Sequence, residues 1–538
     1  MSRLTAATAP RATLIDDGTE APPSSSSEEL GQPTRWLLVK GSRLRLVVAV
    51  VSYVVVSFLV LYPILATPVA ADDFTNPFAQ ADAGGPSLGD AIAFGWRGAT
   101  EGASFRIVGN VVGAFVNWLL VFLSVTFDVG VPTLYAALKF LMIVACAASI
   151  AWCWTCLTQL TERPIAFHHA IGLVSLTLFT TLQIHAYWSN DPVGNYPLVG
   201  FGSTALAFCF LGLVLRFVRK PTALLAAAAT VGAVVAVGYY ELNVGAVMGA
   251  GFILAFFIGR RWSDKDLRWG AVLGSAAILM APALLLIYGR TVTGDQAQSY
   301  GGTTVRTGRV AAETFGLGIL SSLPGAAWAL SVRTLGGTLG IVWVAMAVVL
   351  MLGGISFVWM RSFRGHDIFA RPEGHDLITW AFVAACVTFW FVAIALQAIT
   401  VKVQDEVVGL GYVYTAYCVG AAVVSLGLAA AIRALVARRE CWGAYGPALL
   451  AVGLSFALIQ LTVNWRLSEQ MNSALVLNRQ LLAAFDEDAA PPERCLALQN
   501  WTAVGWPDYF EIGTIDGLDV IFDHFFDEPF CDGFTRPP

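Results

Sequence analysis

Two adjacent carboxylates, Asp72 and Asp73, follow shortly after the first long apolar run of the chain, residues 46–66. Such a pair at a membrane boundary can serve three purposes. One carboxylate can act as a general base that takes a proton from a hydroxyl nucleophile. The two together can hold a divalent cation, Mg²⁺ or Mn²⁺, through their oxygens. They can also do no more than cap the helix that follows.

A second acidic residue, Glu241, lies in the segment GYYELN at residues 238–243, between two apolar runs. Ionisable residues at membrane depth are costly and are often functional. We therefore expect Tyr240 and Glu241 to bind an acceptor or a sugar. The alternative is a polar hairpin tip that faces water.

The segment YWSNDP at residues 187–192 also carries side chains suited to a sugar. Trp188 could stack on a sugar ring while Asp191 bonds to its hydroxyls. The same residues are equally typical of an aromatic belt at a membrane interface followed by a turn. Lys139, inside an apolar run, could reach toward the interface or pair with an acid.

The composition indicates the class of protein, and thereby the kind of secondary structure that must position these residues. The chain of 538 residues is 57% hydrophobic and only 13% charged, whereas soluble domains carry roughly 25% charged residues. A soluble enzyme is thereby excluded. With 32 Lys and Arg against 37 Asp and Glu, the chain also lacks the basic excess of a nucleic-acid-binding protein. We predict an all-α polytopic membrane protein.

The distribution of basic residues orients the predicted spans. We predict that residues 1–45 form a disordered cytoplasmic tail, because the basic end of this segment precedes the first span and would place the N-terminus inside. Thirteen apolar runs follow, and the Arg-rich links all become cytoplasmic if 107–127 and 312–332 lie at the outer interface. The membrane domain, 46–463, then has about eleven spans, within a range of about ten to thirteen.

This topology leaves three sizeable external segments: residues 67–132, 290–337 and the acidic C-terminal tail 464–538. The tail contains Cys495 and Cys531, the two cysteines predicted outside the membrane on the external face. In an oxidising compartment they could form a disulfide. They could also remain two free thiols in a small packed tail.

The residues after the Asp pair carry a family resemblance. A Gly/Pro-rich stretch at 84–86 precedes the tetrapeptide FGWR at 94–97, then Glu101 and Arg106, and then the apolar segment 107–127. This order resembles the GT-C class of integral-membrane glycosyltransferases, especially the O-antigen glucosyltransferase type of bacterial envelope enzymes. The resemblance covers residues 46–157 in detail and depends elsewhere only on the number and orientation of the spans.

The resemblance implies inverting transfer of a sugar from a polyprenyl phosphate to an envelope glycan or lipid, outside the bacterial cytoplasmic membrane. Asp72 or Asp73 would be the general base, and the Asp pair fits chemistry both with and without a divalent cation. Arg97, Arg106 and Arg290 would stabilise the departing phosphate. Alternatively, these arginines only contact lipid headgroups.

Two other functions fit the same topology. A flippase or secondary transporter for lipid-linked sugars would need polar residues near the bilayer midplane. A polysaccharide polymerase or ligase would use a late external loop rich in arginine, which makes 290–337 the candidate, with Arg290, Arg306 and Arg309.

Overall fold

The computed structural model describes residues 40–101, 106–161, 164–185, 191–262, 265–293, 304–328, 354, 377–437, 439–486, 489–504 and 508–534. These residues form helices, and the one bridge among them joins Val305 to Thr400. The chain divides into two compact units, residues 1–55 and 56–538. The all-α class is confirmed. The predicted tail before residue 40, the predicted span at 338–360 and Trp188 lie outside the described residues.

Within the described part of the chain, eight helical stretches are long and apolar enough to cross a membrane. This confirms a polytopic membrane protein, while the count of about eleven spans and their orientation stay predictions. The stretches are built from α4 (Ile107–Phe127), α5 (Val131–Thr158), η1 (Leu198–Gly202) with α7 (Ser203–Arg219), η2 (Glu241–Asn243) with α9 (Val244–Arg261), α10 (Lys265–Thr293), α15 (Leu377–Ala398), α17 (Tyr417–Ala437) and α18 (Arg439–Ala474).

The remaining helices are shorter or less apolar. Two of them, α1 (Lys40–Leu65) and α8 (Ala223–Tyr239), contain apolar stretches of 10–17 residues. The others are α2 (Asp72–Gly84), α3 (Leu88–Thr100), α6 (Phe167–Thr181), α12 (Arg309–Ser321), α16 (Val401–Glu406), α19 (Val476–Asp486), α20 (Pro491–Thr502) and α21 (Asp508–Phe526).

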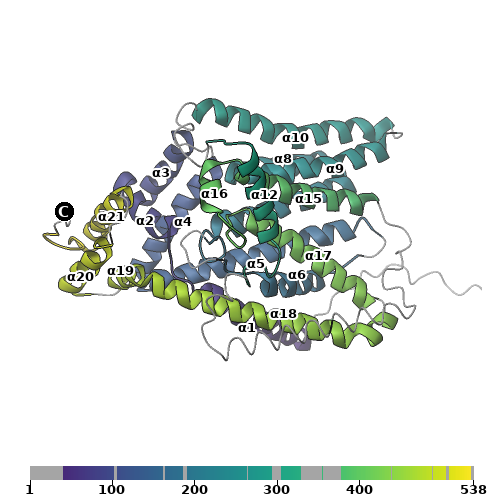
Figure 1. Cartoon of the computed structure of the whole chain (residues 1–538). Helices are drawn as coiled ribbons and strands as arrows, with labels where there is room; N and C mark the ends of the chain where they lie inside the picture. Colours follow the sequence, from purple (N-terminus) through teal and green to yellow (C-terminus); the bar gives the residue numbers. More distant parts are fainter. Residues whose placement is uncertain are drawn as a thin grey trace, which may run out of the picture. The chain divides into compact units, whose positions relative to one another are not determined.

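Three consecutive helices follow the first apolar helix, and the third of them, α4, is one of the eight long apolar stretches. In Figure 1, α2, α3 and α4 run across the direction of α8, α9 and α10. Helix α3 begins with a capping box in which Ser87 and Asp90 each bond to the other's backbone N–H, so its start is fixed locally. A Cβ atom at Gly95 would lie 2.7 Å from the carbonyl oxygen of Asn110, so α3 packs tightly on α4.

The C-terminal helices α19, α20 and α21 pack on α2. Phe74 and Phe78 of α2 are buried there, with ring centroids 5.7 Å from Trp501 and 5.8 Å from Phe485, respectively. A Cβ atom at Gly517 of α21 would lie 2.0 Å from the carbonyl oxygen of Phe78. Only glycine allows this close approach of the two helices, so the C-terminal segment supports the helix that carries the Asp pair.

Two predicted boundaries differ from the structure. The helix predicted over 312–332 is α12, which ends at Ser321; Pro324 and Gly325, with a φ of +90°, follow directly and do not continue a helix. The boundary predicted at residue 464 falls inside α18, because this helix continues to Ala474 after its apolar part ends. Helix formation does not stop where hydropathy falls.

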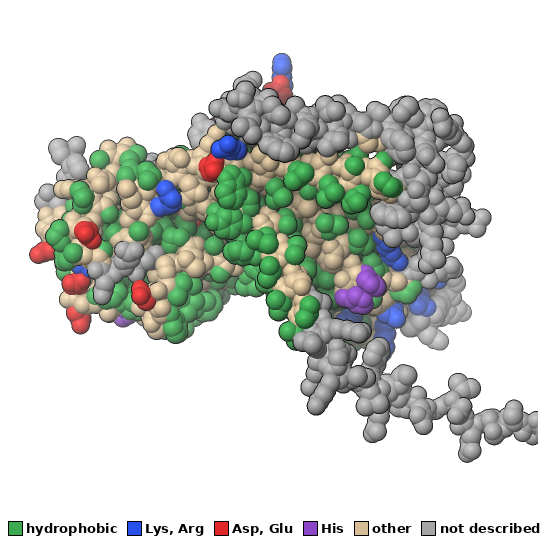
Figure 2. Space-filling model, turned by 90° about the horizontal axis from the view of Figure 1, so that it is seen from below, with side chains coloured by type: hydrophobic (Ala, Val, Ile, Leu, Met, Phe, Trp, Pro, Cys, Tyr) green, Lys and Arg blue, Asp and Glu red, His purple; other side chains and the backbone are tan. Residues whose placement is uncertain are grey.

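The surface agrees with a membrane protein. Figure 2 shows one face on which hydrophobic side chains cover much of the area, while most of the visible acidic side chains gather at the end that carries the C-terminal helices. Large apolar side chains on the long helices are exposed, among them Leu284 at 58% and Ile287 at 62% on α10. A lipid environment would cover such residues without cost.

Candidate active site

Five of the predicted site residues line one cavity of about 700 Å³: Asp72, Asp73, Arg106, Tyr240 and Glu241. The cavity lies among α2, α3, α4, η1, η2, α15 and α16, and α10 contributes Leu286. Segments that are far apart in the sequence therefore meet there. The volume is within the range of small-molecule binding sites.

Asp72 and Asp73 are the first two residues of α2, and backbone dihedral angles near them are unfavourable. Ala71, immediately before the pair, has φ 52° and ψ −141°. Tyr196, whose backbone N–H donates to Asp73 Oδ2 over 2.5 Å, has φ 56°. Positive φ values are unfavourable for both residue types, and such strain concentrates at functional sites. The two strained residues lie directly beside the Asp73 carboxylate.

Hydrogen bonds join the segment before the pair to the loop that contains Tyr196. Lys139 is 1% exposed, and its Nζ donates to the carbonyl oxygen and Oγ1 of Thr67 over 2.9 and 2.7 Å. The backbone N–H of Ala70 donates to Oδ1 of Asn195 over 3.2 Å. Lys139 therefore stabilises the segment that precedes α2 from inside the protein, and its side chain does not extend to a membrane interface.

Asp191 belongs to the same loop but not to the cavity lining. It is 0% exposed, and its carboxylate accepts from the backbone N–H of Gly194 over 2.6 Å and of His185 over 3.2 Å. The His185 Nδ1 lies 3.3 Å from it. A carboxylate that is bonded in this way and has no solvent exposure stabilises its own loop; the bond of Asp191 to a sugar stays a prediction.

Burial raises the pKa of Asp73 to about 7. The Tyr196 N–H opposes this shift, the neighbouring Asp72 adds to it, and Lys139 opposes it. The net result is a carboxyl group that exchanges its proton near neutral pH, as a general base requires.

Arg106 and Glu241 form a bidentate ion pair on another wall of the cavity. Arg106 Nε donates to Glu241 Oε2 over 2.5 Å, and its Nη2 donates to Oε1. The guanidinium lies 4.4 Å from the centre of the Tyr240 ring. Burial lowers the pKa of Arg106, but Glu241 more than offsets this, so the guanidinium stays charged. The sequence suggested a free cation and a free acid here; the structure pairs them.

Tyr240 is held from its other side. Its hydroxyl lies 2.8 Å from Thr415 Oγ1 and accepts from Gln397 Nε2 over 3.3 Å. All three side chains line the cavity. Neither Gln397 nor Thr415 was singled out from the sequence, because both lie in or next to apolar runs without a local signal.

The other predicted cations do not contribute a described side chain to the cavity. Arg97 is exposed, and its guanidinium donates to the carbonyl oxygen of Ala83 over 3.4 Å. Arg290 belongs to α10, but its side chain lies outside the described residues. Arg306 bonds to Gln404 and Asp405, and Arg309 bonds to Glu313. Arg97 does not line the cavity, and its role in stabilising the departing phosphate stays a prediction.

Lys402 is a cation of the cavity that the sequence did not point out. It lies on α16, with its Nζ 5.7 Å from the centre of the Tyr414 ring and 4.0 Å from Glu406 Oε1. The available signal was the scarcity of lysine, since Lys402 is one of five in the chain.

The described residues of the cavity offer a divalent cation fewer protein ligands than a metal site usually has. Among the described residues, no group of three His, Cys, Asp or Glu side chains is placed to hold a metal. Mg²⁺ at Asp72 and Asp73 would take its remaining ligands from water and substrate, as this ion commonly does.

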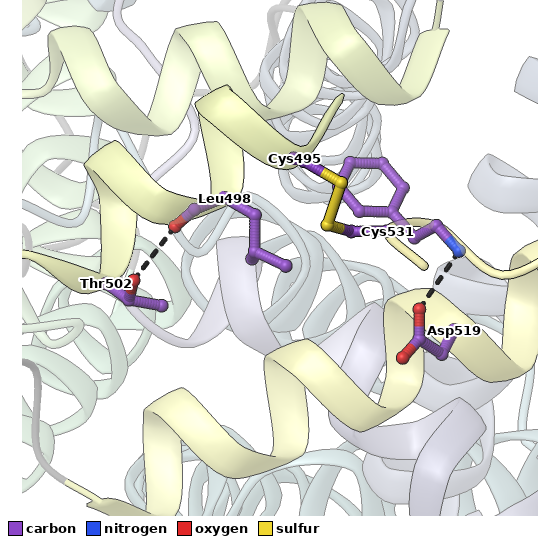
Figure 3. Close-up of a disulfide and its surroundings, with 6 residues drawn as sticks. Cys495, Leu498, Thr502, Asp519 and Cys531 are labelled. Atoms are coloured by element: carbon purple, nitrogen blue, oxygen red, sulfur yellow. Dashed lines mark hydrogen bonds between the residues drawn. A yellow bond between two sulfur atoms is a disulfide. The ribbon is translucent and has the colours of Figure 1, made fainter. Parts of the chain in front are cut away.

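The two cysteines of the C-terminal segment form a disulfide (Figure 3). Cys495 of α20 is bonded to Cys531, 36 residues later, beyond the end of α21. The backbone N–H of Phe530 donates to Asp519 Oδ1 over 3.0 Å and fixes the chain just before Cys531. The bond closes the segment that packs on α2.

No family model matches the chain, and searches of the curated proteins and of the solved structures return no match.

Proposed function

We propose that this protein is an inverting glycosyltransferase of GT-C type that uses a polyprenyl-phosphate-linked sugar. It would act at the outer face of the bacterial cytoplasmic membrane on a glycan or lipid of the cell envelope. The observation that supports this most directly is the Asp73 carboxylate, which lines a cavity of about 700 Å³ and has a pKa raised to about 7.

In the proposed reaction, ionised Asp73 accepts the proton of an acceptor hydroxyl as that oxygen attacks the anomeric carbon of the donor. The new bond forms between the acceptor oxygen and this carbon. The bond from the carbon to the phosphate oxygen breaks, and its electron pair leaves with the polyprenyl phosphate. A single displacement of this kind inverts the anomeric centre.

The cavity also has features that suit the donor. Lys402 and Arg106 place positive charge on its lining, and positive charge stabilises a departing phosphate. Each of the two cations is also close to a carboxylate, Arg106 to Glu241 and Lys402 to Glu406, and we assign this role to both. Leu286 and Leu396 line the cavity from α10 and α15. Their apolar side chains are suited to the first isoprene units of the lipid.

The test is transfer by the purified full-length protein in lipid nanodiscs. Radiolabelled polyprenyl-phosphate hexose and pentose serve as donors, and a lipid and glycan extract of the bacterial envelope supplies acceptors. Asp73→Asn should reduce transfer by roughly 100-fold or more, since it removes the general base. Asp82→Asn is the matched control, because Asp82 lies on the same helix, is exposed and does not line the cavity.

Full activity of Asp73→Asn would contradict the proposal. So would movement of labelled donor across sealed vesicles with no product formed by the wild-type protein, a result that favours transport.

A further inference from the structure

The wall of the cavity formed by α2 and α4 is chemically different from the rest. Four carboxamide side chains line it, namely Asn76, Gln80, Asn110 and Asn117. Each carboxamide can both donate and accept hydrogen bonds. Among the described residues, the lining that α2 and α4 provide contains no Lys or Arg, and its only charged side chains are those of the Asp pair.

Part of this wall is fixed before any ligand binds. Gln80 is 4% exposed, and its Nε2 donates to the carbonyl oxygen of Ala114 over 3.0 Å. Asn117 Nδ2 lies 3.5 Å from Gln80 Oε1. The amide of Gln80 is therefore held in one orientation, and ordering it again on binding would cost little conformational entropy.

Two glycines of α4 line the cavity on this wall, Gly109 and Gly113. A Cβ atom at Gly109 would lie 2.1 Å from the carbonyl oxygen of Tyr239, so this glycine is required by helix packing. A Cβ atom at Gly113 would meet nothing within 4 Å, although Gly113 lies in the middle of α4 and lines the cavity. Helix packing therefore does not require glycine at position 113, and because Gly113 lines the cavity, a larger side chain there would occupy part of it.

We infer that this wall binds an uncharged, hydroxyl-rich carbohydrate unit, which under the proposed function is the acceptor. Carboxamides match hydroxyl groups because both donate and accept hydrogen bonds. The carboxylates of Asp72 and Asp73 repel a negative charge at short range. The site therefore selects neutral pyranosides or furanosides over uronic acids of the same size.

Binding can be measured without the donor and without catalysis. Binding is measured by saturation-transfer NMR on the full-length protein in nanodiscs. The neutral ligands are the methyl glycosides of glucose, galactose, mannose and arabinofuranose, and methyl glucuronide is the negatively charged control. At least one neutral glycoside should bind, and the glucuronide of the same ring should bind about tenfold more weakly or not at all. This corresponds to about 1.4 kcal/mol.

Two glycine variants distinguish the cavity from general effects. Gly113→Leu should weaken glycoside binding about tenfold or more, because the new side chain occupies the space in front of the amides. Gly172→Leu is the control, since Gly172 is also helical, has nothing within 4 Å of its Cβ position and lies on an exposed face of α6. The unfolding temperatures of both variants show whether they fold.

Failure of this inference can be separated from failure of the proposed function. If Gly113→Leu removes binding but the wild-type protein transfers no sugar from any donor, the binding site stands and the transferase proposal falls. If no neutral glycoside binds, or if the best one binds equally to Gly113→Leu, the inference is overturned even where transfer is observed.

Discussion

The acidic residues of the cavity are held in two opposite ways. Glu241 is matched by Arg106 in a bidentate pair beneath the ring of Tyr240. Asp72 and Asp73 lie next to one another, and among the described residues neither forms a salt bridge. Balanced charge needs no further explanation than stability, whereas unbalanced buried charge is retained at a cost and more often marks chemistry.

The two regions also rest on different parts of the structure. Glu241 lies in a single turn between α8 and α9, both of which belong to the group of apolar helices. Asp72 and Asp73 open α2, which packs on the C-terminal helices through Phe78 and Gly517. One wall of the cavity therefore depends on the apolar helices, and the other depends on the packing of α2 against the C-terminal helices.

The largest expected effect is on the pH dependence at Asp73. Its folded-state pKa, about 7, lies above the ordinary value of 3.8, so the native state binds the proton more tightly between these pH values. Stability therefore falls as pH rises through this window. Transfer should rise about tenfold per pH unit below pH 7 and then level off, because the base must be ionised.

Rates and unfolding temperatures measured from pH 4 to pH 9 check both effects. Asp73→Asn should unfold at a higher temperature than the wild type at pH 8 and should lose this part of the pH dependence. If the rate of sugar transfer did not change between pH 5 and pH 8, the assignment of the general base to Asp73, and with it the difference from Glu241, would be contradicted.

The next effect concerns the segment that supports the Asp pair. Replacing Cys495 and Cys531 by Ser removes a cross-link across 36 residues, which should destabilise α19–α21 by about 2–4 kcal/mol. Hydrogen exchange should become faster in these helices and in α2, but not in α8 and α9. Cys209→Ser is the control, since Cys209 is a free cysteine of α7. Equal acceleration in α8 and α9 would show that both walls depend on the C-terminal segment.

The smallest effect is expected at the balanced pair. The side chains of Arg106 and Glu241 are 29% and 40% exposed, so solvent screens their attraction, and Glu241→Gln should cost only about 1 kcal/mol. A double-mutant cycle with Arg106→Gln, followed by thermal unfolding, isolates the coupling. Asp72→Asn should act in the opposite direction and raise stability, because it removes a repulsion. If Glu241→Gln and Asp72→Asn changed the free energy of unfolding in the same direction, the proposed difference between the paired and the adjacent carboxylates would be contradicted.

Much of the fold could be predicted from local properties of the sequence. The length and apolarity of the runs determine helices such as α8 and α9 and the class of protein, because burial in lipid requires continuous apolar segments with internally bonded backbones. The same local reasoning selected Asp72 and Asp73, whose position after an apolar run is visible in the sequence. It did not locate the end of α12, which stops at Ser321, shortly before Pro324 and Gly325.

The site itself was decided by tertiary structure. Arg106 and Glu241 are 135 residues apart in the chain, and the N–H that bonds to Asp73 comes from Tyr196. Lys402 and the carboxamide wall reach the same cavity from helices far apart in the sequence. No local pattern records these neighbours, because distances between side chains on different helices depend on how the helices pack. Composition and periodicity describe each helix alone. The packing of all the helices determines which charged side chains form ion pairs and which line the cavity without one.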